Sequence, residues 1–470
     1  MTNPPSAPTS ASLSTSTRDA LEALAPGAVS SDPSLLDSHA VDWSREHAQL
    51  PALVLRPKTV DELSALLRYC NEEGLAVVVQ GGMTGLSGGA TPRPGELALS
   101  LARMSGVIEL DKRSMTLTAW AGTPLQTLQQ AAADAGLQLP LDLGARGSCT
   151  IGGNVSTNAG GNQVLSYGMT RALVLGLEAV LADGTVVSSL NKMLKNNAGY
   201  DLKHLFIGSE GTLGIVTRVV LRLYPVAQSK QTALCAFRSF AEAIDFLQLV
   251  QRHMPRVTAF ELMWKNYIDT VFSLCEGLQD PFQQRYPFYV LVQCEGGNPE
   301  GDLAAFEQLL FAQMEAGTIV DGVIAQSETE AGDFWAIRDA VSELLATVKD
   351  RANFDIGVPI NEMEACVDDI SCELRAQYPD IQMPIFGHIA DSNLHIIAWT
   401  PRAEEVEAIY LRVYQIVQRY GGTVTAEHGV GVMKIKYLQY CRSPQELALM
   451  HTMKQALDPN GILNAGRVVS

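Results

Sequence analysis

A chain of 470 residues is too long for one ordinary hydrophobic core, so we expect at least two domains. Its formal net charge of −17 argues against a nucleic-acid groove, which needs clustered lysine and arginine side chains. The eight cysteines include no Cys-x-x-Cys pair, which argues against a disulfide framework or an iron–sulfur cluster and favours reduced thiols in a cytoplasmic protein.

We expect no secretory signal in the N-terminal segment, and the absence of arginine before Arg18 weakens the case for a transit peptide. Its first residues have neither the basic region nor the apolar region of a secretory signal. We expect residues 1–17 to form a disordered tail, because they are rich in serine, threonine and proline. No apolar run in the chain reaches the roughly 18 to 20 residues that a transmembrane helix requires.

Strands and helices alternate through the first half of the chain. Thr59 is a good N-cap for a helix over Thr59–Asn71, where leucines recur at helical spacing. Asp183-Gly184 predicts a tight turn between two strands that begin after Ala172. The other expected elements are helices at Asp19–Leu24 and Pro124–Ala135 and strands at Leu53–Pro57, Ala76–Val79, Leu97–Leu101, Val107–Leu110, Thr116–Ala121 and Val219–Tyr224.

Three glycine-rich segments punctuate this half. Val77–Ala90 reads VVVQGGMTGLSGGA, so a buried strand ends in a glycine loop, as it does where main chain wraps a pyrophosphate. It matches neither the P-loop nor Gly-x-Gly-x-x-Gly. Leu141–Asn162 reads LDLGARGSCTIGGNVSTNAGGN, whose apolar residues favour a ligand cradle over a flexible linker. With Gly208–Thr217, these loops predict a large, flat, phosphate-bearing ligand.

The second half, from about Gln228 to Gly421, alternates helices with strands. Helices are expected at Phe240–Arg252 and Gly301–Glu315, and a strand at Phe288–Gln293. The pattern predicts an antiparallel sheet with helices on one face.

Two histidines and an acidic motif suggest a metal site in this half. His388 and His395 share the segment FGHIADSNLHI, where a bend near Asp391-Ser392 must occur if both reach one ligand. Alone, they read more simply as two unrelated histidines. Glu427 and His428, in TAEHGVG, add an oxygen ligand and a third imidazole, which is compatible with a metal site without proving one.

Six motifs carry a resemblance to a known family, namely GGMTGLSGG, PLDLGARGSCTIGGNVSTNAGG, NNAGYDLKHLFIGSEGTLGIVT, FGHIADSNLHI, TAEHGVG and LDPNGILNAGRV. The chain resembles the FAD-binding oxidoreductases of the vanillyl-alcohol oxidase (VAO) and p-cresol methylhydroxylase (PCMH) type, in the branch of the D-lactate and D-2-hydroxyglutarate dehydrogenases. The resemblance implies an α+β fold. Residues 18–227 would form a two-part FAD-binding domain, 228–421 an antiparallel-sheet cap domain, and 422–470 a segment that returns to complete the flavin site.

The resemblance also implies the flavin contacts. Some relatives attach FAD to a histidine in the first glycine loop, and residues 81–89 contain none, so we expect non-covalent FAD. The implied cofactor-binding residues are Gly81, Gly82, Met83, Thr84, Gly85, Leu86, Pro140, Asp142, Gly147, Ser148, Gly152, Gly153, Asn154, Ser156, Asn158, Gly160, Gly161, Glu210, Gly211, Gly214, Ile215 and Asn464.

On the substrate side, the residues matching His388, His395 and Glu427 bind a divalent metal in the family, commonly zinc, and the residue matching His428 is the catalytic base. A metal bound to a hydroxyl lowers its pKa, and a histidine can take the proton. The arginine matching Arg338 binds a substrate carboxylate with help from the residue matching Ser342, which helical spacing would place on the same face. Asn393 is a further candidate for the carboxylate.

The chain departs from the family pattern at two places. Dicarboxylate-oxidising members carry a lysine where this chain has Asn353, which weakens the case for D-2-hydroxyglutarate. Ala390 and Ser392 replace the glycines of the usual Gly-Asp-Gly, which changes the loop between the two histidines.

We therefore expect an FAD-dependent dehydrogenase that oxidises a small D-2-hydroxy acid, either D-lactate or a dicarboxylate of the D-2-hydroxyglutarate or D-malate type. Its electrons would pass to an electron-transfer flavoprotein or a quinone-linked carrier. Two alternatives stay open, a flavin oxidase of another alcohol and a flavin-binding subunit of a glycolate-oxidase-like complex. A homodimer is one option for its assembly.

Overall fold

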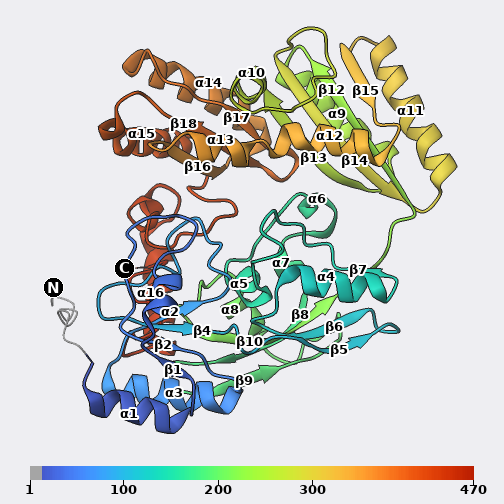
Figure 1. Cartoon of the computed structure of the whole chain (residues 1–470). Helices are drawn as coiled ribbons and strands as arrows, with labels where there is room; N and C mark the ends of the chain where they lie inside the picture. Colours follow the sequence, from blue (N-terminus) through green and yellow to red (C-terminus); the bar gives the residue numbers. More distant parts are fainter. Residues whose placement is uncertain (1–12, 470) are drawn as a thin grey trace. The chain divides into compact units, whose positions relative to one another are not determined.

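The computed structural model describes residues 13–469, which divide into two compact units. Among these residues, unit 1 contains 13–161, 167–226 and 427–469, and unit 2 contains 162–166 and 227–426 (Figure 1). The sequence suggested divisions after residues 227 and 421, whereas the compact units divide after residues 226 and 426.

The N-terminus departs from the sequence prediction. The first helix, α1 (Thr15–Leu24), begins four residues before the expected start at Asp19. Ser14 caps it, since the Ser14 side chain accepts a hydrogen bond from the amide of Thr17 at 3.1 Å. The predicted disordered tail is therefore wrong for residues 15–17, and its first twelve residues lie outside the described part of the chain.

Unit 1 contains a four-stranded sheet in the order β1-β2-β4-β3, in which β4 pairs in parallel with both of its neighbours. The predicted helix beside it is confirmed as α3 (Val60–Glu73), capped by Thr59 and ended by Gly74 in the left-handed region at φ +64°. The strands are β1 (Val29–Ser30), β2 (Val54–Leu55), β3 (Val77–Gln80) and β4 (Leu97–Ser100).

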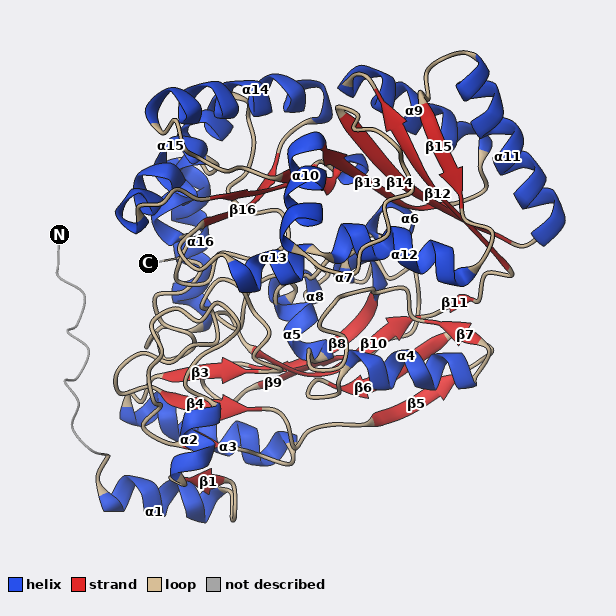
Figure 2. Cartoon of the chain, turned by 45° about the horizontal axis from the view of Figure 1, so that its top comes forward, coloured by secondary structure: helices blue, strands red, loops and turns tan. Residues whose placement is uncertain are grey.

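Unit 1 also contains a five-stranded antiparallel sheet in the order β5-β6-β10-β8-β9 (Figure 2). The predicted Asp183-Gly184 turn is confirmed between β8 and β9, with the Leu181 amide donating to the Thr185 carbonyl at 2.9 Å. The strands are β5 (Val107–Asp111), β6 (Thr116–Trp120), β8 (Val174–Val180), β9 (Val186–Ser189) and β10 (Ile215–Arg222), and β7 (Leu137–Gln138) pairs with β11 (Tyr224–Pro225).

The remaining helices of unit 1 are mostly short. They are α2 (Pro33–Ser38), α4 (Leu125–Asp134), α5 (Ile151–Ser156), α7 (Thr170–Leu173), α8 (Lys203–Phe206), the 3₁₀ helix η3 (Ile435–Tyr440) and α16 (Pro444–Leu457). Helix α6 (Val164–Tyr167) begins in the short 162–166 segment of unit 2. The C-terminal residues join the four-stranded sheet, because Leu463 forms a parallel bridge with Val77 at the start of β3.

Unit 2 is built on a seven-stranded sheet in the order β15-β12-β14-β13-β17-β18-β16, and every pairing is antiparallel, as the sequence predicted. The strands are β12 (Ser229–Phe237), β13 (Val257–Trp264), β14 (Phe288–Gly296), β15 (Asp321–Ile324), β16 (Ala352–Gly357), β17 (Ile385–His388) and β18 (Asn393–Ala398).

Helices cover both faces of this sheet, so the expectation of helices on one face is wrong. On one face, Phe246 of α9 (Phe240–His253) packs on Phe237 and Phe260. On the other, Phe334 and Ile337 of α12 (Glu328–Asp339) join the hydrophobic cluster that contains Leu234. Most residues of the central strands β12, β13 and β14 are buried in continuous runs rather than in alternation, which is the pattern of a sheet covered on two sides.

The other helices of unit 2 are α10 (Lys265–Leu274), α11 (Pro299–Glu315), α13 (Val341–Thr347), α14 (Ile360–Gln377), α15 (Val406–Arg419) and the 3₁₀ helices η1 (Ile389–Asp391) and η2 (Ala403–Glu405). None of the helices in residues 13–469 is both long and apolar enough to span a bilayer.

Candidate functional site

Every residue that the sequence assigned to the cofactor lies in unit 1. These residues form three loops, which we call the cradle: 80–86 after β3, 140–161 around α5, and 208–215 before β10, together with Asn464. The Asn464 side chain links strand β3 to the 208–215 loop, since its Oδ1 accepts from the Val79 amide at 2.7 Å and its Nδ2 donates to the Glu210 carbonyl at 2.6 Å. Because its polar atoms bond main chain, Asn464 shapes the cradle.

Glu210 has a similar part. Its carboxylate accepts hydrogen bonds from the amides of Val430 at 2.7 Å and Gly431 at 2.8 Å, so it fixes the start of the C-terminal segment within unit 1. Burial raises the pKa of this carboxyl, although the two amides favour its charged form. The side chain of Glu210 therefore organises the protein around the cradle.

Several cradle glycines are needed for a different reason from the one that the sequence suggested. A Cβ on Gly82 would lie 2.1 Å from the Ser148 carbonyl oxygen, and one on Gly161 would lie 1.9 Å from the Asp142 carbonyl oxygen. At these two positions an added Cβ would meet protein main chain, so glycine allows two loops to approach each other closely there. Gly144, by contrast, has no atom within 4 Å of an added Cβ.

Four residues of the predicted cofactor set adopt a strained backbone conformation. Met83, Asn158, Glu210 and Asn464 have φ angles of +57°, +49°, +51° and +42°, in the left-handed region that residues with a side chain rarely occupy. Such strain persists only where the surrounding structure enforces it, and it gathers at ligand sites. Its concentration here marks the cradle as a binding region.

The cradle also contains buried polar atoms with no hydrogen-bond partner among the described residues. They are Gln80 Oε1 at the end of β3, Thr150 Oγ1 and Asn154 Nδ2. Thr150 is the N-cap residue of α5, yet its hydroxyl makes no capping bond. Buried polar atoms are normally paired, so these atoms fit a bound dinucleotide that completes their hydrogen bonds. Sequence reasoning missed Gln80 and Thr150, which sit beside the glycines in both motifs.

In unit 2, four polar residues, Glu261, His388, His395 and Asp355, share the sheet face that α12 covers. The strand register places Glu261 of β13 opposite His388 of β17, and places His395 of β18 opposite both Phe386 and Asp355. The chain turns between the two histidines through η1, with Ser392 at φ +69°. The predicted bend at Asp391-Ser392 is therefore confirmed. The two imidazole centroids lie 5.5 Å apart.

Glu261, Arg338 and His388 form a buried hydrogen-bonded triad. Glu261 Oε2 accepts from Arg338 Nε at 2.8 Å, and Glu261 Oε1 lies 2.6 Å from His388 Nδ1. Arg338 Nη2 lies 3.3 Å from His388 Nε2. The three side chains are only 1%, 7% and 8% exposed. Burial opposes ionisation of Glu261, but His388 and Arg338 outweigh it and lower the pKa of this carboxyl to about 2.

Glu261 was missed by the sequence analysis. The only available signal was one acid inside the strand-like run TAFELMW, in which its neighbours are mostly apolar. A lone acid in an apolar strand needs a buried cation, and nothing in the sequence indicates that Arg338, 77 positions away, provides it.

The predicted partnership of Arg338 with Ser342 on one helix face is wrong. Helix α12 ends at Asp339 and α13 begins at Val341, so no continuous turn links the two residues. The Tyr267 hydroxyl contacts the carbonyls of Ile337 and Arg338 at 3.1 and 2.7 Å, which are helix-end groups. Arg338 is buried and Ser342 is exposed.

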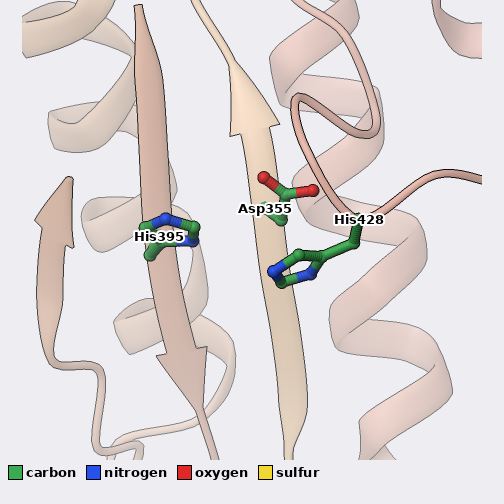
Figure 3. Close-up of side chains that lie close together, drawn as sticks. All are labelled: Asp355, His395 and His428. Atoms are coloured by element: carbon green, nitrogen blue, oxygen red, sulfur yellow. The ribbon is translucent and has the colours of Figure 1, made fainter. Parts of the chain in front are cut away.

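Potential metal ligands gather near this face. Asp355 Oδ2 accepts from the Thr425 hydroxyl at 2.9 Å, which fixes the chain just before Glu427 and His428. Those two residues continue directly from Ala426. Two overlapping groups have their ligand atoms within 4.8 Å of one another: His388, His395 and Glu427, and Asp355, His395 and His428 (Figure 3). The first group has the two imidazoles and one carboxylate that the sequence suggested.

Two more residues at the turn have the chemistry of ligands. Asn393 is 3% exposed, and neither its Nδ2 nor its Oδ1 has a partner among the described residues. Asp391 Oδ1 is also buried without a partner in that part of the chain, and burial raises the pKa of Asp391 to about 6. Unsatisfied donors and acceptors beside imidazoles fit a divalent cation and an oxygen-rich substrate.

Comparisons with known proteins identify the family of this chain. Residues 51–189 match the family described as FAD binding domain, and residues 226–468 match FAD linked oxidases, C-terminal domain. A D-2-hydroxyglutarate dehydrogenase of Xanthomonas citri pv. viticola is 38% identical over 447 residues, which are 93% of each chain. A putative mitochondrial D-lactate dehydrogenase of Schizosaccharomyces pombe is 36% identical over 446 residues, which are 92% of this chain and 85% of that one.

The fold is also found among solved structures. A crystal structure of p-cresol methylhydroxylase with bound substrate matches with a TM-score of 0.74 at 16% identity, over 96% of both chains. At that identity the match speaks for the fold alone. Together with the family matches and the relatives, it bears out the sequence resemblance: the chain belongs to the FAD-binding oxidoreductases of the VAO/PCMH type, in the D-2-hydroxy-acid dehydrogenase branch.

Proposed function

We propose that the protein oxidises a D-2-hydroxy acid to the 2-oxo acid, with non-covalently bound FAD as the electron acceptor. The observation that carries this proposal is the buried polar group of unit 2, where a charge-compensated arginine, two imidazoles and an unsatisfied asparagine lie on one sheet face. In a chain of this family, the arginine and the asparagine could bind the carboxylate of a 2-hydroxy acid, and the imidazoles could help to hold a metal beside its hydroxyl.

The cofactors would supply the chemistry that side chains cannot: FAD accepts a hydride at N5, and a divalent metal acidifies the substrate hydroxyl. His388, His395 and Glu427 offer the ligand set for such a metal, and zinc accepts two imidazoles and one carboxylate. Glycines, main-chain amides and the unpartnered Thr150 and Asn154 atoms of the cradle suit FAD.

The protein's own residues would then bind the substrate and move the proton. The Arg338 guanidinium would donate hydrogen bonds to the substrate carboxylate, and the Asn393 amide would donate to a second oxygen. A ring nitrogen of His428 would accept the hydroxyl proton. Ser342 is a weaker candidate for the carboxylate than it looked from the sequence, because it is exposed and lies on a different helix.

The substrate side chain is a further part of the proposal. Asn353 pairs with Ile397, one same-face step along from the Asp355–His395 pair, and neither side chain of this pair is charged. An uncharged wall favours a small or apolar substrate side chain, as in D-lactate, over the distal carboxylate of D-2-hydroxyglutarate. The two relatives described above are a D-2-hydroxyglutarate dehydrogenase and a putative D-lactate dehydrogenase.

Two wider expectations belong with this proposal. All eight cysteines are free thiols, six of them buried, which suits a reducing compartment such as the cytoplasm. The electron acceptor would be an electron-transfer flavoprotein or a quinone-linked carrier, since a dehydrogenase must be reoxidised by another redox protein or a quinone.

A panel of D- and L-2-hydroxy acids tests the proposal under anaerobic conditions. We expect bleaching of the flavin by D-monocarboxylates and a smaller response to D-dicarboxylates. Rapid reoxidation of the reduced protein by oxygen would instead indicate a flavin oxidase, and full inactivity of the purified chain would indicate a subunit of a larger complex. Acid precipitation should release the flavin into the supernatant, because we expect no covalent link.

A further inference from the structure

Glu261 belongs to no part of the proposed reaction, yet it contacts two of the side chains that would carry it out. We propose that Glu261 is a positioning residue, which fixes the imidazole of His388 for metal binding and holds the Arg338 guanidinium in place. This inference rests on the proposed function and deepens it.

The contacts assign the hydrogen positions on His388. An ionised carboxylate only accepts hydrogen bonds, so His388 Nδ1, 2.6 Å from Glu261 Oε1, must carry the proton. A guanidinium only donates, so His388 Nε2, 3.3 Å from Arg338 Nη2, must accept. Both contacts therefore place the lone pair of His388 on Nε2, where a metal would bind. A carboxylate on the far nitrogen is the usual way of fixing a metal-binding histidine.

The geometry also explains why this position holds a carboxylate. Glu261 faces two donors, Nδ1–H of His388 and Nε–H of Arg338, and each takes one of its oxygens. A glutamine offers one acceptor oxygen and one donor nitrogen, so one of the two contacts would be lost. At 1% exposure of Glu261, water cannot easily replace it.

The triad further links the two functions of its members. His388 Nε2 has one lone pair, which either accepts from Arg338 Nη2 or binds a metal. A metal held by His388 Nε2 would occupy that lone pair, and Arg338 Nη2 could then donate to a substrate carboxylate while Nε stays bonded to Glu261. Metal binding and substrate binding should therefore strengthen each other. Glu261 couples them because it stays bonded to both His388 and Arg338.

Glu261→Gln tests this role through zinc affinity, measured by chelator competition on the FAD-loaded protein. We expect zinc affinity about 10 to 100-fold weaker than wild type. KM for the hydroxy acid should rise more than kcat falls, because Arg338 loses its alignment. The matched control is Glu178→Gln in unit 1, a carboxylate that is 2% exposed and accepts from Arg218 Nε at 2.7 Å. It should leave zinc affinity unchanged.

Flavin content and melting temperature show whether each variant folds. If Glu261→Gln does not fold, Glu261→Asp replaces it, since the shorter carboxylate cannot reach both donors and should weaken zinc binding several-fold. Zinc affinity within about threefold of wild type in the folded variant overturns the role of Glu261 and leaves the proposed function intact. Failure of the wild-type protein to bind zinc overturns the metal site and this inference together.

Discussion

The cradle of unit 1 is shaped mainly by main-chain contacts. In unit 2, by contrast, the sheet face that α12 covers is organised by charged side chains. In the cradle, glycines allow two loops to approach each other closely. Asn464 forms hydrogen bonds with the main chain of Val79 and of Glu210, which are far apart in the sequence. In unit 2, the triad places an arginine, a glutamate and a histidine together under a covering helix. One region depends on shape and the other on charge, so mutations should damage them in different ways.

The largest effect should come from the proposed base. We expect His428→Ala to slow flavin reduction by substrate about 10² to 10⁴-fold, because no other group would accept the hydroxyl proton as well. FAD content should stay at the wild-type level, since the cradle is not touched. Rapid-reaction absorbance measures the rate, and His451→Ala, an exposed histidine on α16, is the control. Flavin reduction within a few fold of wild type would exclude His428 as the base.

A shape change should instead damage the cradle. Gly82→Ala would place a methyl group 2.1 Å from the Ser148 carbonyl oxygen, so the two loops must separate. We expect a loss of at least about 1 to 3 kcal/mol in stability, together with weaker FAD retention. Gly297→Ala, in unit 2 and outside the cradle, is the matched control, since nothing lies within 4 Å of its added Cβ. Thermal melting and flavin stoichiometry measure both effects, and equal behaviour of the two variants would contradict this account of the cradle.

A buried acid of unit 2 should give a pH-dependent effect. Burial raises the pKa of Asp391 from 3.8 to about 6, so ionising it costs the folded state stability as pH rises through that range. Asp391→Asn removes this cost. In the metal-free protein we expect the variant to be more stable by at most about 2 to 3 kcal/mol above pH 7, with the gain vanishing as pH falls towards 4. Urea unfolding at several pH values measures it, and a gain that does not depend on pH would be inconsistent with the burial of Asp391.

The smallest effect concerns specificity. Asn353→Lys adds a cation on β16, in the sheet face that α12 covers. The distal carboxylate of a dicarboxylate substrate should therefore bind better. We expect kcat/KM for D-2-hydroxyglutarate relative to D-lactate to rise about tenfold, the equivalent of about 1.4 kcal/mol. Asn361→Lys, at an exposed position of α14, is the control. An unchanged ratio would show that Asn353 does not line the substrate site.

The two regions also differ in how far they could be predicted from the sequence. Local signals were enough for α3, where Thr59 and Gly74 mark both ends, and for the β8–β9 turn at Asp183-Gly184. The glycine loops could be predicted because all residues of such a loop are neighbours in the sequence. The spacing of His388 and His395 likewise required the turn that the structure contains.

The rest depended on contacts between distant segments. Glu261 meets Arg338 and His388 only because β13 pairs with β17 and α12 crosses that face, and no local pattern encodes those neighbours. No glycine or proline marks the end of α12 after Asp339. The Tyr267 hydroxyl that contacts the last carbonyls of α12 comes from another helix, α10. The reason for Gly82 was hidden in the same way, since its close neighbour is Ser148.

The central claim is that this chain holds FAD and uses it to oxidise a D-2-hydroxy acid with the help of a metal. Anaerobic flavin reduction by matched D and L enantiomers, before and after chelation and again after zinc is restored, tests it most directly. We expect reduction by the D enantiomer alone, its loss with chelator and its recovery with zinc. Protein that takes up no flavin, or flavin that either enantiomer reduces equally well without metal, would contradict it.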